Sequence, residues 1–170
     1  MVPIETNLGK ENPYLMGRID SDLMYDIVLN WNWGNSERTD IYHDPETRKN
    51  SISFRSNMAR LAEQLINENK TEKAKKVMDL AIEKMPLDYF GYYSLLVPFV
   101  DGYYRINDVK VAQDLSKKIG YKYFDRLEYF NSLSAERQYE LGEEIVTEIE
   151  RYRSLIEAEL KHADKSDLKP

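Results

Sequence analysis

The chain contains no cysteine, and only two histidines and seven glycines among its 170 residues. The missing cysteine excludes disulfides, iron–sulfur clusters and thiolate zinc sites, although it does not fix the cellular compartment. His43 and His162 lie far apart in the sequence, so we expect no metal site and no cofactor. The few glycines are too scattered for a phosphate-binding loop, and no serine has a credible histidine partner for nucleophilic catalysis.

Long apolar runs and an excess of basic charge are also missing. No apolar stretch approaches the roughly 20 residues that a membrane-spanning helix requires, so we expect no membrane insertion by this chain. The net charge of −6 argues against nucleic acid as a partner, because phosphate backbones are bound by basic surfaces. With 42% apolar and 32% charged residues, the composition is that of a folded, soluble protein.

Apolar residues recur at the spacing of amphipathic helices through most of the chain. The clearest case is residues 55–86, where two such segments are separated by the polar turn of residues 67–70. Thr71 is expected to cap the second helix and Pro86 to end it, because proline disfavours a helical residue before it. The sequence therefore predicts an all-α fold built on this antiparallel helical hairpin.

Small residues occupy the positions at which the two helices of this hairpin would cross. Ala62, Ala74 and Ala81 would allow the two backbones to approach closely. The pattern resembles the tetratricopeptide repeat, a helical motif of about 34 residues. The matching positions, counted from Arg55, are Met58, Leu61, Ala62, Leu65, Ala74, Met78, Ala81 and Pro86. An ordinary helical hairpin is the alternative.

A second, looser repeat follows between residues 89 and 120. Its signature positions would be Leu96, Phe99, Val100, Tyr103, Ala112 and Ile119. Pro98 lies within its first predicted helix, where a proline kinks the chain, and Gly120 is expected to end its second helix. Most of the tyrosines and phenylalanines lie between residues 89 and 130, and we interpret this cluster as core, with a sugar-binding surface as the alternative.

Further helices are predicted before the repeats. The first covers residues 21–33, with Asp20 as its cap, and ends in Trp31 and Trp33, for which packing is favoured over a ligand site. Its apolar stripe comprises Leu23, Met24, Ile27, Val28 and Trp31. Residues 44–46, Asp-Pro-Glu, have the pattern of a helix start and begin the helix that enters the first repeat.

A long acidic helix is predicted near the C-terminal end, from about residue 135 to residue 161, with Ser134 as its cap. Its apolar seam comprises Tyr139, Gly142, Ile145, Val146, Ile149, Tyr152 and Ile156. We expect the seam to cover the open end of the repeats, and a homodimer through this helix is the alternative. The excess of glutamate along it indicates a solvated face rather than an acidic docking surface.

The predicted organisation has three parts. Residues 1–19 form an extended N-terminal segment, residues 20–161 a single helical repeat-type domain, and residues 162–170 a frayed tail. Tetratricopeptide domains usually bind through the inner face of their first helices, so the resemblance implies a groove there for a protein or peptide. Its candidate residues are Ser56, Arg60, Glu63, Asn67, Ser94, Asp101, Tyr104 and Arg105.

Four stretches carry a wider resemblance: residues 17–35, 40–66, 73–86 and 88–105. They resemble the soluble C-terminal region of bacterial multi-spanning membrane proteins of a domain-of-unknown-function family related to protein O-mannosyltransferases. In that family the membrane part is regarded as a glycosyltransferase that uses a lipid-linked sugar, and the soluble region faces the extracytoplasmic (periplasmic) side. The resemblance implies that residues 1–19 lead from a membrane part that this sequence lacks, so no catalytic residue carries over.

These observations predict a noncatalytic domain that positions a protein or an acceptor substrate for an attached membrane glycosyltransferase. We expect no enzyme activity from this chain. Three alternatives stay open: a free-standing tetratricopeptide-type adaptor, a glycan-binding helical module, and a small helical hydrolase or transferase that uses an unrecognised carboxylate pair. Adjacent acids such as Glu143 and Glu144 are typical of helix starts and solvated faces, so they are not that pair.

Overall fold

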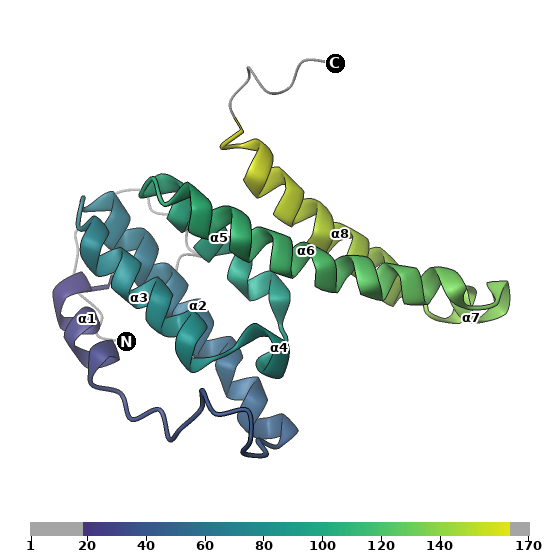
Figure 1. The fold of residues 1–170 in the computed structure, drawn as a ribbon, viewed down its shortest axis with the longest axis horizontal. Coiled ribbons are helices and arrows are strands. Elements are labelled where there is room, and N and C mark those ends of the chain that lie inside the picture. Colours follow the sequence, from purple (N-terminus) through teal and green to yellow (C-terminus); the bar gives the residue numbers. More distant parts are fainter. Residues whose placement is uncertain (1–18, 164–170) are drawn as a thin grey trace. The chain divides into compact units, whose positions relative to one another are not determined.

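The computed structural model describes residues 19–163. This part of the chain is all-α, as predicted, with eight α-helices, α1 to α8, and one short 3-10 helix, η1 (Figure 1). Packing divides the chain after Phe90 into two compact units, unit 1 (residues 1–90) and unit 2 (residues 91–170). Each unit is described by itself below. Nearly all of the predicted N-terminal segment and most of the predicted tail lie outside the described residues.

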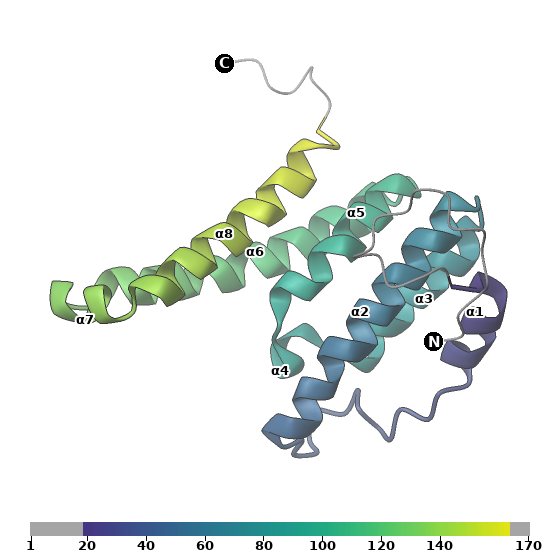
Figure 2. The same cartoon turned by 180° about the vertical axis from the view of Figure 1, so that it is seen from behind.

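Unit 1 contains α1 (Ser21–Leu29), α2 (Pro45–Asn67), α3 (Thr71–Lys84) and α4 (Leu87–Phe90). Helices α2 and α3 lie side by side and α1 packs against both, as Figure 1 and Figure 2 show from opposite sides. The chain turns between α2 and α3 at Asn69, whose φ of +60° is one that asparagine tolerates. The predicted pair of helices with its turn is therefore present, and its membership of a repeat family stays a prediction.

The core of unit 1 is formed mainly by the facing sides of α2 and α3. The small residues Ala62, Ala74 and Ala81 are at most 3% exposed, which fits the close approach of the two helices. Arg55 is also fully buried, and its Nη2 donates a hydrogen bond of 2.7 Å to the main-chain oxygen of Met85 at the end of α3. The fully buried apolar residues around them include Val28, Met58, Leu61, Leu65, Val77 and Met78.

Two of the three helix caps predicted in unit 1 are present in the structure. Asp20 and Asp44 each accept a hydrogen bond of 2.9 Å from the backbone N–H three residues on, and so cap α1 and α2. The cap predicted at Thr71 is wrong, because Thr71 is already the first residue of α3. Lys70 stands at the cap position without a capping side-chain bond, and its ammonium group is instead paired with Asp22 at 2.7 Å.

Helix α1 is shorter than predicted and ends at Leu29 rather than near residue 33. The side chain of Asn30 donates to the main-chain oxygen of Asp26 at 2.8 Å, and thereby uses the carbonyl that the next helical N–H would need. The predicted apolar stripe is only partly buried. Leu23 is 43% exposed, and Val28 is the one member that is fully buried.

Unit 2 contains η1 (Tyr93–Leu96), α5 (Val97–Arg105), α6 (Val109–Ser132), α7 (Ala135–Glu140) and α8 (Gly142–Leu160). Helix α7 lies at the end of α6 and turns the chain, so that α8 runs back along α6 (Figures 1 and 2). Helix α5 packs against both α6 and α8. The predicted signature positions Leu96, Phe99, Val100, Tyr103, Ala112 and Ile119 are all buried.

Proline and glycine act differently in unit 2 than predicted. Pro98 does not kink a helix, because η1 ends at Leu96 and Pro98 falls in the first turn of α5, where its missing N–H needs no partner. Gly120 does not end a helix and lies inside α6. A Cβ atom at Gly120 would lie 3.8 Å from Tyr152 and 4.0 Å from Leu155, so this glycine faces α8.

The helix predicted over residues 135–161 is two helices, α7 and α8, which are separated at Leu141. Ser134 caps α7 as predicted, because its side chain accepts the N–H of Arg137. The predicted apolar seam is only partly buried, and Gly142, Ile145 and Tyr152 are its half-buried members. Its members Tyr139, Val146, Ile149 and Ile156 are between 39% and 89% exposed. The side of α8 that is buried instead contains Glu148 and Leu155, which are 3% and 2% exposed.

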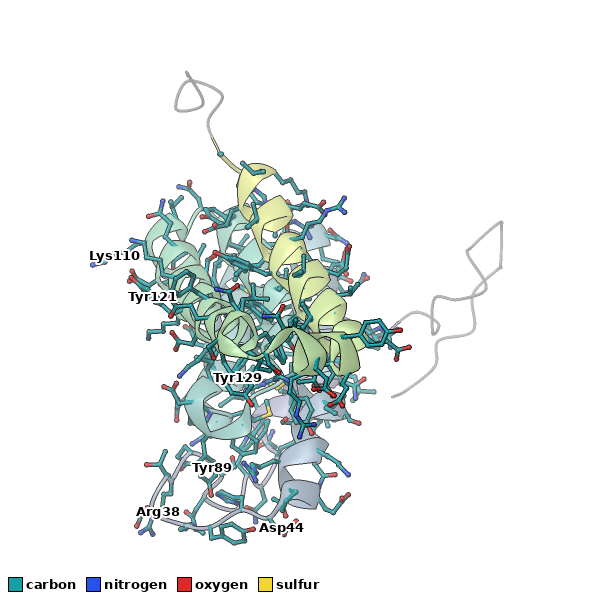
Figure 3. The ribbon with its side chains drawn as sticks, turned by 90° about the vertical axis from the view of Figure 1, so that its right-hand side faces the viewer. Arg38, Asp44, Tyr89, Lys110, Tyr121 and Tyr129 are labelled. Carbon is teal, nitrogen blue, oxygen red and sulfur yellow. The ribbon has the colours of Figure 1, made fainter. Side chains whose placement is uncertain are left out.

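The aromatic stretch that was predicted as core is divided between core and surface. Its buried members are Phe90, Phe99, Tyr103, Tyr123 and Phe130. Its exposed members are Tyr92, Tyr121, Phe124 and Tyr129, and Figure 3 shows Tyr121 at the margin of the molecule.

Candidate functional site

The predicted groove residues are divided between the two units. Those on α2 of unit 1 are Ser56, Arg60, Glu63 and Asn67. Those of unit 2 are Ser94 on η1, with Asp101, Tyr104 and Arg105 on α5. The structure therefore does not assemble all eight within one unit.

Two of the groove positions in unit 2 are occupied by the chain itself. The Nε2 atom of His162 lies 2.8 Å from a carboxylate oxygen of Asp101, and Lys161 donates to the same oxygen at 2.7 Å. The imidazole of His162 also stacks on the ring of Tyr104, with the ring centroids 4.9 Å apart. Burial acts to raise the pKa of Asp101, but these two hydrogen bonds outweigh it and the pKa lies below its usual value. His162, which was predicted to fray, is thus held on α5.

A pocket of about 380 Å³ lies within unit 1, which is near the small end of the usual range for ligand sites. We call it the aromatic pocket. Its apolar walls are formed by Trp31, Trp33, Phe54, Met85 and Phe90, together with His43. Its polar side chains are Asn32, Ser36, Thr47, Asn50 and Ser51. No Asp, Glu, Lys or Arg is among the residues that line it, so the pocket suits an uncharged ligand.

Three aromatic rings form one wall of the aromatic pocket. The ring centroids of Trp31, Trp33 and Phe54 are 5.0–5.6 Å apart, and each pair is inclined edge to face or tilted. The tryptophans are two residues apart in the non-helical segment after α1, a spacing that places side chains on the same side of an extended chain. Gly34 and Asn35 follow with φ of +57° and +62°, and they turn the chain away.

A second wall is held in place by the hydroxyl group of Tyr89. This hydroxyl accepts the backbone N–H of His43 at 2.7 Å and donates to a main-chain carbonyl of the same loop at 2.6 Å. The centroid of the His43 imidazole lies 5.3 Å from the ring centroid of Tyr89 and 5.9 Å from that of Phe90. Figure 3 shows Tyr89 on the side of unit 1 that carries Arg38 and Asp44 of this loop. Helix α4 therefore fixes the position of His43.

Two nitrogen atoms of the lining residues are buried without a hydrogen-bond partner: Nε2 of His43 and Nε1 of Trp33. The whole side chain of His43 is only 9% exposed. Leaving such a group unpaired costs about 1–3 kcal/mol, and native proteins contain few of them. Pairing requires an acceptor for the indole N–H of Trp33 and a donor or an acceptor for the imidazole of His43. Because both nitrogen atoms are closed to solvent, a ligand in the pocket reaches them only if these side chains turn toward it.

The hydroxyl groups of the pocket are not arranged for nucleophilic chemistry. Ser36 donates to the main-chain oxygen of Lys84 and Ser51 to that of Arg48, each at 2.6 Å. The third lining hydroxyl group, that of Thr47, donates to the carboxylate of Asp44 at 2.8 Å. None of the three donates to His43, so they do not form the hydrogen-bonded nucleophile and base that acyl transfer uses. Across residues 19–163, no three His, Asp or Glu side chains gather as metal ligands.

Comparison with known proteins gives no match: no protein-family model, no curated protein and no solved structure matches this chain. The tetratricopeptide resemblance and the wider family resemblance therefore stay predictions. Over the part of the chain that the structure describes, no helix is long and apolar enough to cross a membrane.

Proposed function

We propose that this chain is a noncatalytic binding domain, whose aromatic pocket holds a neutral sugar residue of a larger ligand. The observation that carries the proposal is the wall of three aromatic rings combined with two buried, unpartnered nitrogen atoms and no charged lining residue. A sugar ring presents an apolar C–H face to an aromatic wall, and its edge carries hydroxyl groups that both donate and accept hydrogen bonds. Such a ligand carries the donors and acceptors that Trp33 and His43 lack, and it would pair with them once their side chains turn toward the pocket.

A cationic ligand fits the same pocket less well. Aromatic cages hold a quaternary ammonium group between the faces of separated rings. In this pocket the centroids of Trp31, Trp33 and Phe54 are at most 5.6 Å apart, so the rings pack on one another and leave no room between them. The absence of Asp and Glu from the lining residues removes the charge that such cages often add.

The wider resemblance supplies the biological role in this proposal. A domain attached to a membrane glycosyltransferase on the extracytoplasmic side would hold a glycosylated segment of the acceptor, and so position it for the next transfer. The aromatic pocket supports this role because it is suited to holding a sugar, and its serine hydroxyls are engaged with main-chain carbonyls rather than with His43.

Tryptophan fluorescence tests the proposal directly, because both tryptophans of the chain line the pocket. The methyl glycosides of glucose, mannose, galactose and N-acetylglucosamine serve as probes, and we expect at least one to change the emission saturably. Phe54→Ala and His43→Ala should weaken that response by about ten-fold or more. Tyr42→Ala is the matched control, because Tyr42 precedes His43 but is 78% exposed and does not line the pocket.

Failure of all four glycosides to change the emission would contradict the proposal, as would an unchanged response in Phe54→Ala. Hydrolysis or transfer of the same glycosides by the isolated chain, abolished by substitution of one carboxylate, would contradict its noncatalytic part. Trp33→Phe keeps an aromatic ring but removes the indole N–H together with part of the ring surface, and we expect it to weaken the response less than Phe54→Ala does.

A further inference from the structure

Unit 2 leaves a row of apolar side chains exposed along α8. Val146, Ile149, Ile156 and Leu160 are between 39% and 59% exposed. Their spacing of three, seven and four residues places them on one face of a helix with 3.6 residues per turn. Glu148 and Leu155 lie on the adjacent side of α8, and it is this side that is buried within unit 2. We call the exposed residues the apolar row.

The apolar row continues onto α6 across a groove of about 340 Å³. The groove is lined by Tyr121 and Phe124 from α6 and by Tyr152 and Ile156 from α8, and the charged residues Lys117 and Glu159 also line it. Tyr121 and Phe124 are at least half exposed, and Figure 3 shows the Tyr121 side chain at the surface. Contiguous apolar surface of this kind on a folded protein marks an interaction site.

The apolar row has the spacing of a coiled-coil contact face. Val146, Arg153 and Leu160 are seven residues apart, and Ile149 and Ile156 stand at the intermediate positions of the same heptads. The four apolar members are thus placed to pack against one further helix, with Arg153 in the middle of the face.

A row of glutamates follows one edge of this face. Glu143, Glu150 and Glu157 are exposed and also seven residues apart. From its place in the middle of the face, Arg153 pairs with Glu150 at 3.8 Å and with Glu157 at 2.9 Å, so its guanidinium group is directed toward the acidic edge. In coiled coils the edge charges of one helix face those of its partner, and opposite charges select the pairing.

These charges decide between the candidate occupants. A second copy of α8 in antiparallel orientation would set the glutamate row against itself, and a parallel copy would set Arg153 against Arg153. An anionic membrane surface would be repelled by the glutamates. A helix with an apolar seam between lysine or arginine edges avoids the repulsion between glutamates, and it places no second Arg153 against the first.

We propose that α8 binds a basic amphipathic helix of another protein through the apolar row. The partner's apolar seam covers Val146, Ile149, Ile156 and Leu160, and its basic edge pairs with the glutamate row. This site is separate from the aromatic pocket of unit 1, and either proposal can fail without the other.

Two synthetic helical peptides of about three heptads test the proposal, with the same leucine seam and with either lysine or glutamate at the edge positions. Isothermal titration of the full chain should show saturable binding of the lysine peptide, which weakens as salt is added, and no binding of the glutamate peptide. Ile149→Lys should reduce the affinity for the lysine peptide by about ten-fold or more. Tyr139→Ser is the matched control, because Tyr139 is 89% exposed but lies on α7 outside the row.

The double variant Glu150→Lys, Glu157→Lys provides a second, independent readout. It should lose the lysine peptide and bind the glutamate peptide instead, an exchange that a merely unfolded variant would not show. Equal binding of both peptides by the unmodified chain, or binding of neither, overturns the proposal. So does a homodimer in sedimentation equilibrium that Ile149→Lys dissociates, or binding to phosphatidylglycerol vesicles without binding to the lysine peptide.

Discussion

Single alanines determine how closely the two long helices of unit 1 approach. Ala74 is fully buried and Ala62 nearly so, so larger side chains at either position have no free space to enter. We expect Ala62→Leu and Ala74→Leu each to lower the free energy of unfolding by about 1–3 kcal/mol, as measured by urea denaturation. Glu63→Ala is the matched control on the exposed side of α2 and should change it by less than about 0.5 kcal/mol. The reverse ranking would show that the alanines do not lie at the crossing.

Gly120 is a position where a larger residue should help. A Cβ atom there would meet Tyr152 and Leu155 at 3.8 Å and 4.0 Å, which is ordinary van der Waals contact, and the backbone is helical. We expect Gly120→Ala to raise the free energy of unfolding by about 0.5–1 kcal/mol, because alanine loses less conformational entropy in a helix. A thermal melt can measure the change, and a fall in stability would mean that α6 and α8 need the glycine for a closer approach.

The residues of the aromatic pocket show what a sequence can and cannot reveal about a site. For Trp31 and Trp33 the sequence favoured packing over a ligand site, and the structure places both in the wall of the pocket. His43 and Phe54 come from a loop and from α2, and only folding brings them to the tryptophans. The unpartnered state of the His43 and Trp33 nitrogen atoms depends on every neighbour in space, so no local pattern carries it.

At the scale of elements, α8 shows how a regular pattern can predict the wrong buried face. Ile149 and Ile156 recur at helical spacing and were expected to face inward, but they are 48% and 39% exposed and Glu148 is buried instead. This carboxylate lies 2.9 Å from Arg151 and 3.7 Å from Arg126 of α6, and these pairings are what make its burial tolerable. Hydrophobic periodicity takes no account of such ion pairs. A prediction based on it therefore chose the more apolar side of the helix as the buried face.

The orientation of α8 can be measured through the two neighbouring residues Glu148 and Ile149. Glu148→Ala removes a buried ion-pair partner, and we expect it to lower the free energy of unfolding by about 1–3 kcal/mol. Ile149→Ala removes a side chain that is 48% exposed and should have the smaller effect. Chemical denaturation of both variants compares them, and a larger loss from Ile149→Ala would support the seam predicted from the sequence.

The boundaries of elements were predictable where local side chains decide them. Asp20, Asp44 and Ser134 cap helices as expected, because a cap depends on residues only three positions away. The predicted helix end at Gly120 and the predicted kink at Pro98 were wrong, because the effect of each residue depends on its place within the helix and on what packs against it. The all-α class itself followed from periodicity summed over many residues, which is why it was confirmed.

At the scale of the whole molecule, stability in acid should depend on one network of charges in unit 1. Hydrogen bonds from Lys70 and Lys73 lower the pKa of Asp22 from 3.8 to about 2. Hydrogen bonds from Gln64, Lys70 and Ser21 lower the pKa of Glu68 from 4.5 to about 2. The network joins α1 to the turn between α2 and α3.

The sign of the pH dependence follows from these lowered pKa values. The unfolded chain binds protons to both carboxylates at higher pH than the folded chain does, so their contribution is complete above about pH 5 and is lost toward pH 2. We expect the urea midpoint to fall over this interval, and to fall less at high salt because the ion pairs are partly exposed to solvent. Lys70→Met should flatten the dependence, and an unchanged slope in that variant would show that other carboxylates control it.

The other end of the α2–α3 pair is held in a way that protons do not affect. There the buried guanidinium of Arg55 donates to the main-chain oxygen of Met85, and a carbonyl group does not titrate in this range. Burial lowers the pKa of Arg55 only to about 10, so this donor stays charged throughout acid conditions. Acidification should therefore release α1 first and leave the α2–α3 pair closed at its Met85 end, a sequence of events that amide hydrogen exchange near pH 3 would record as early loss of protection in α1 alone.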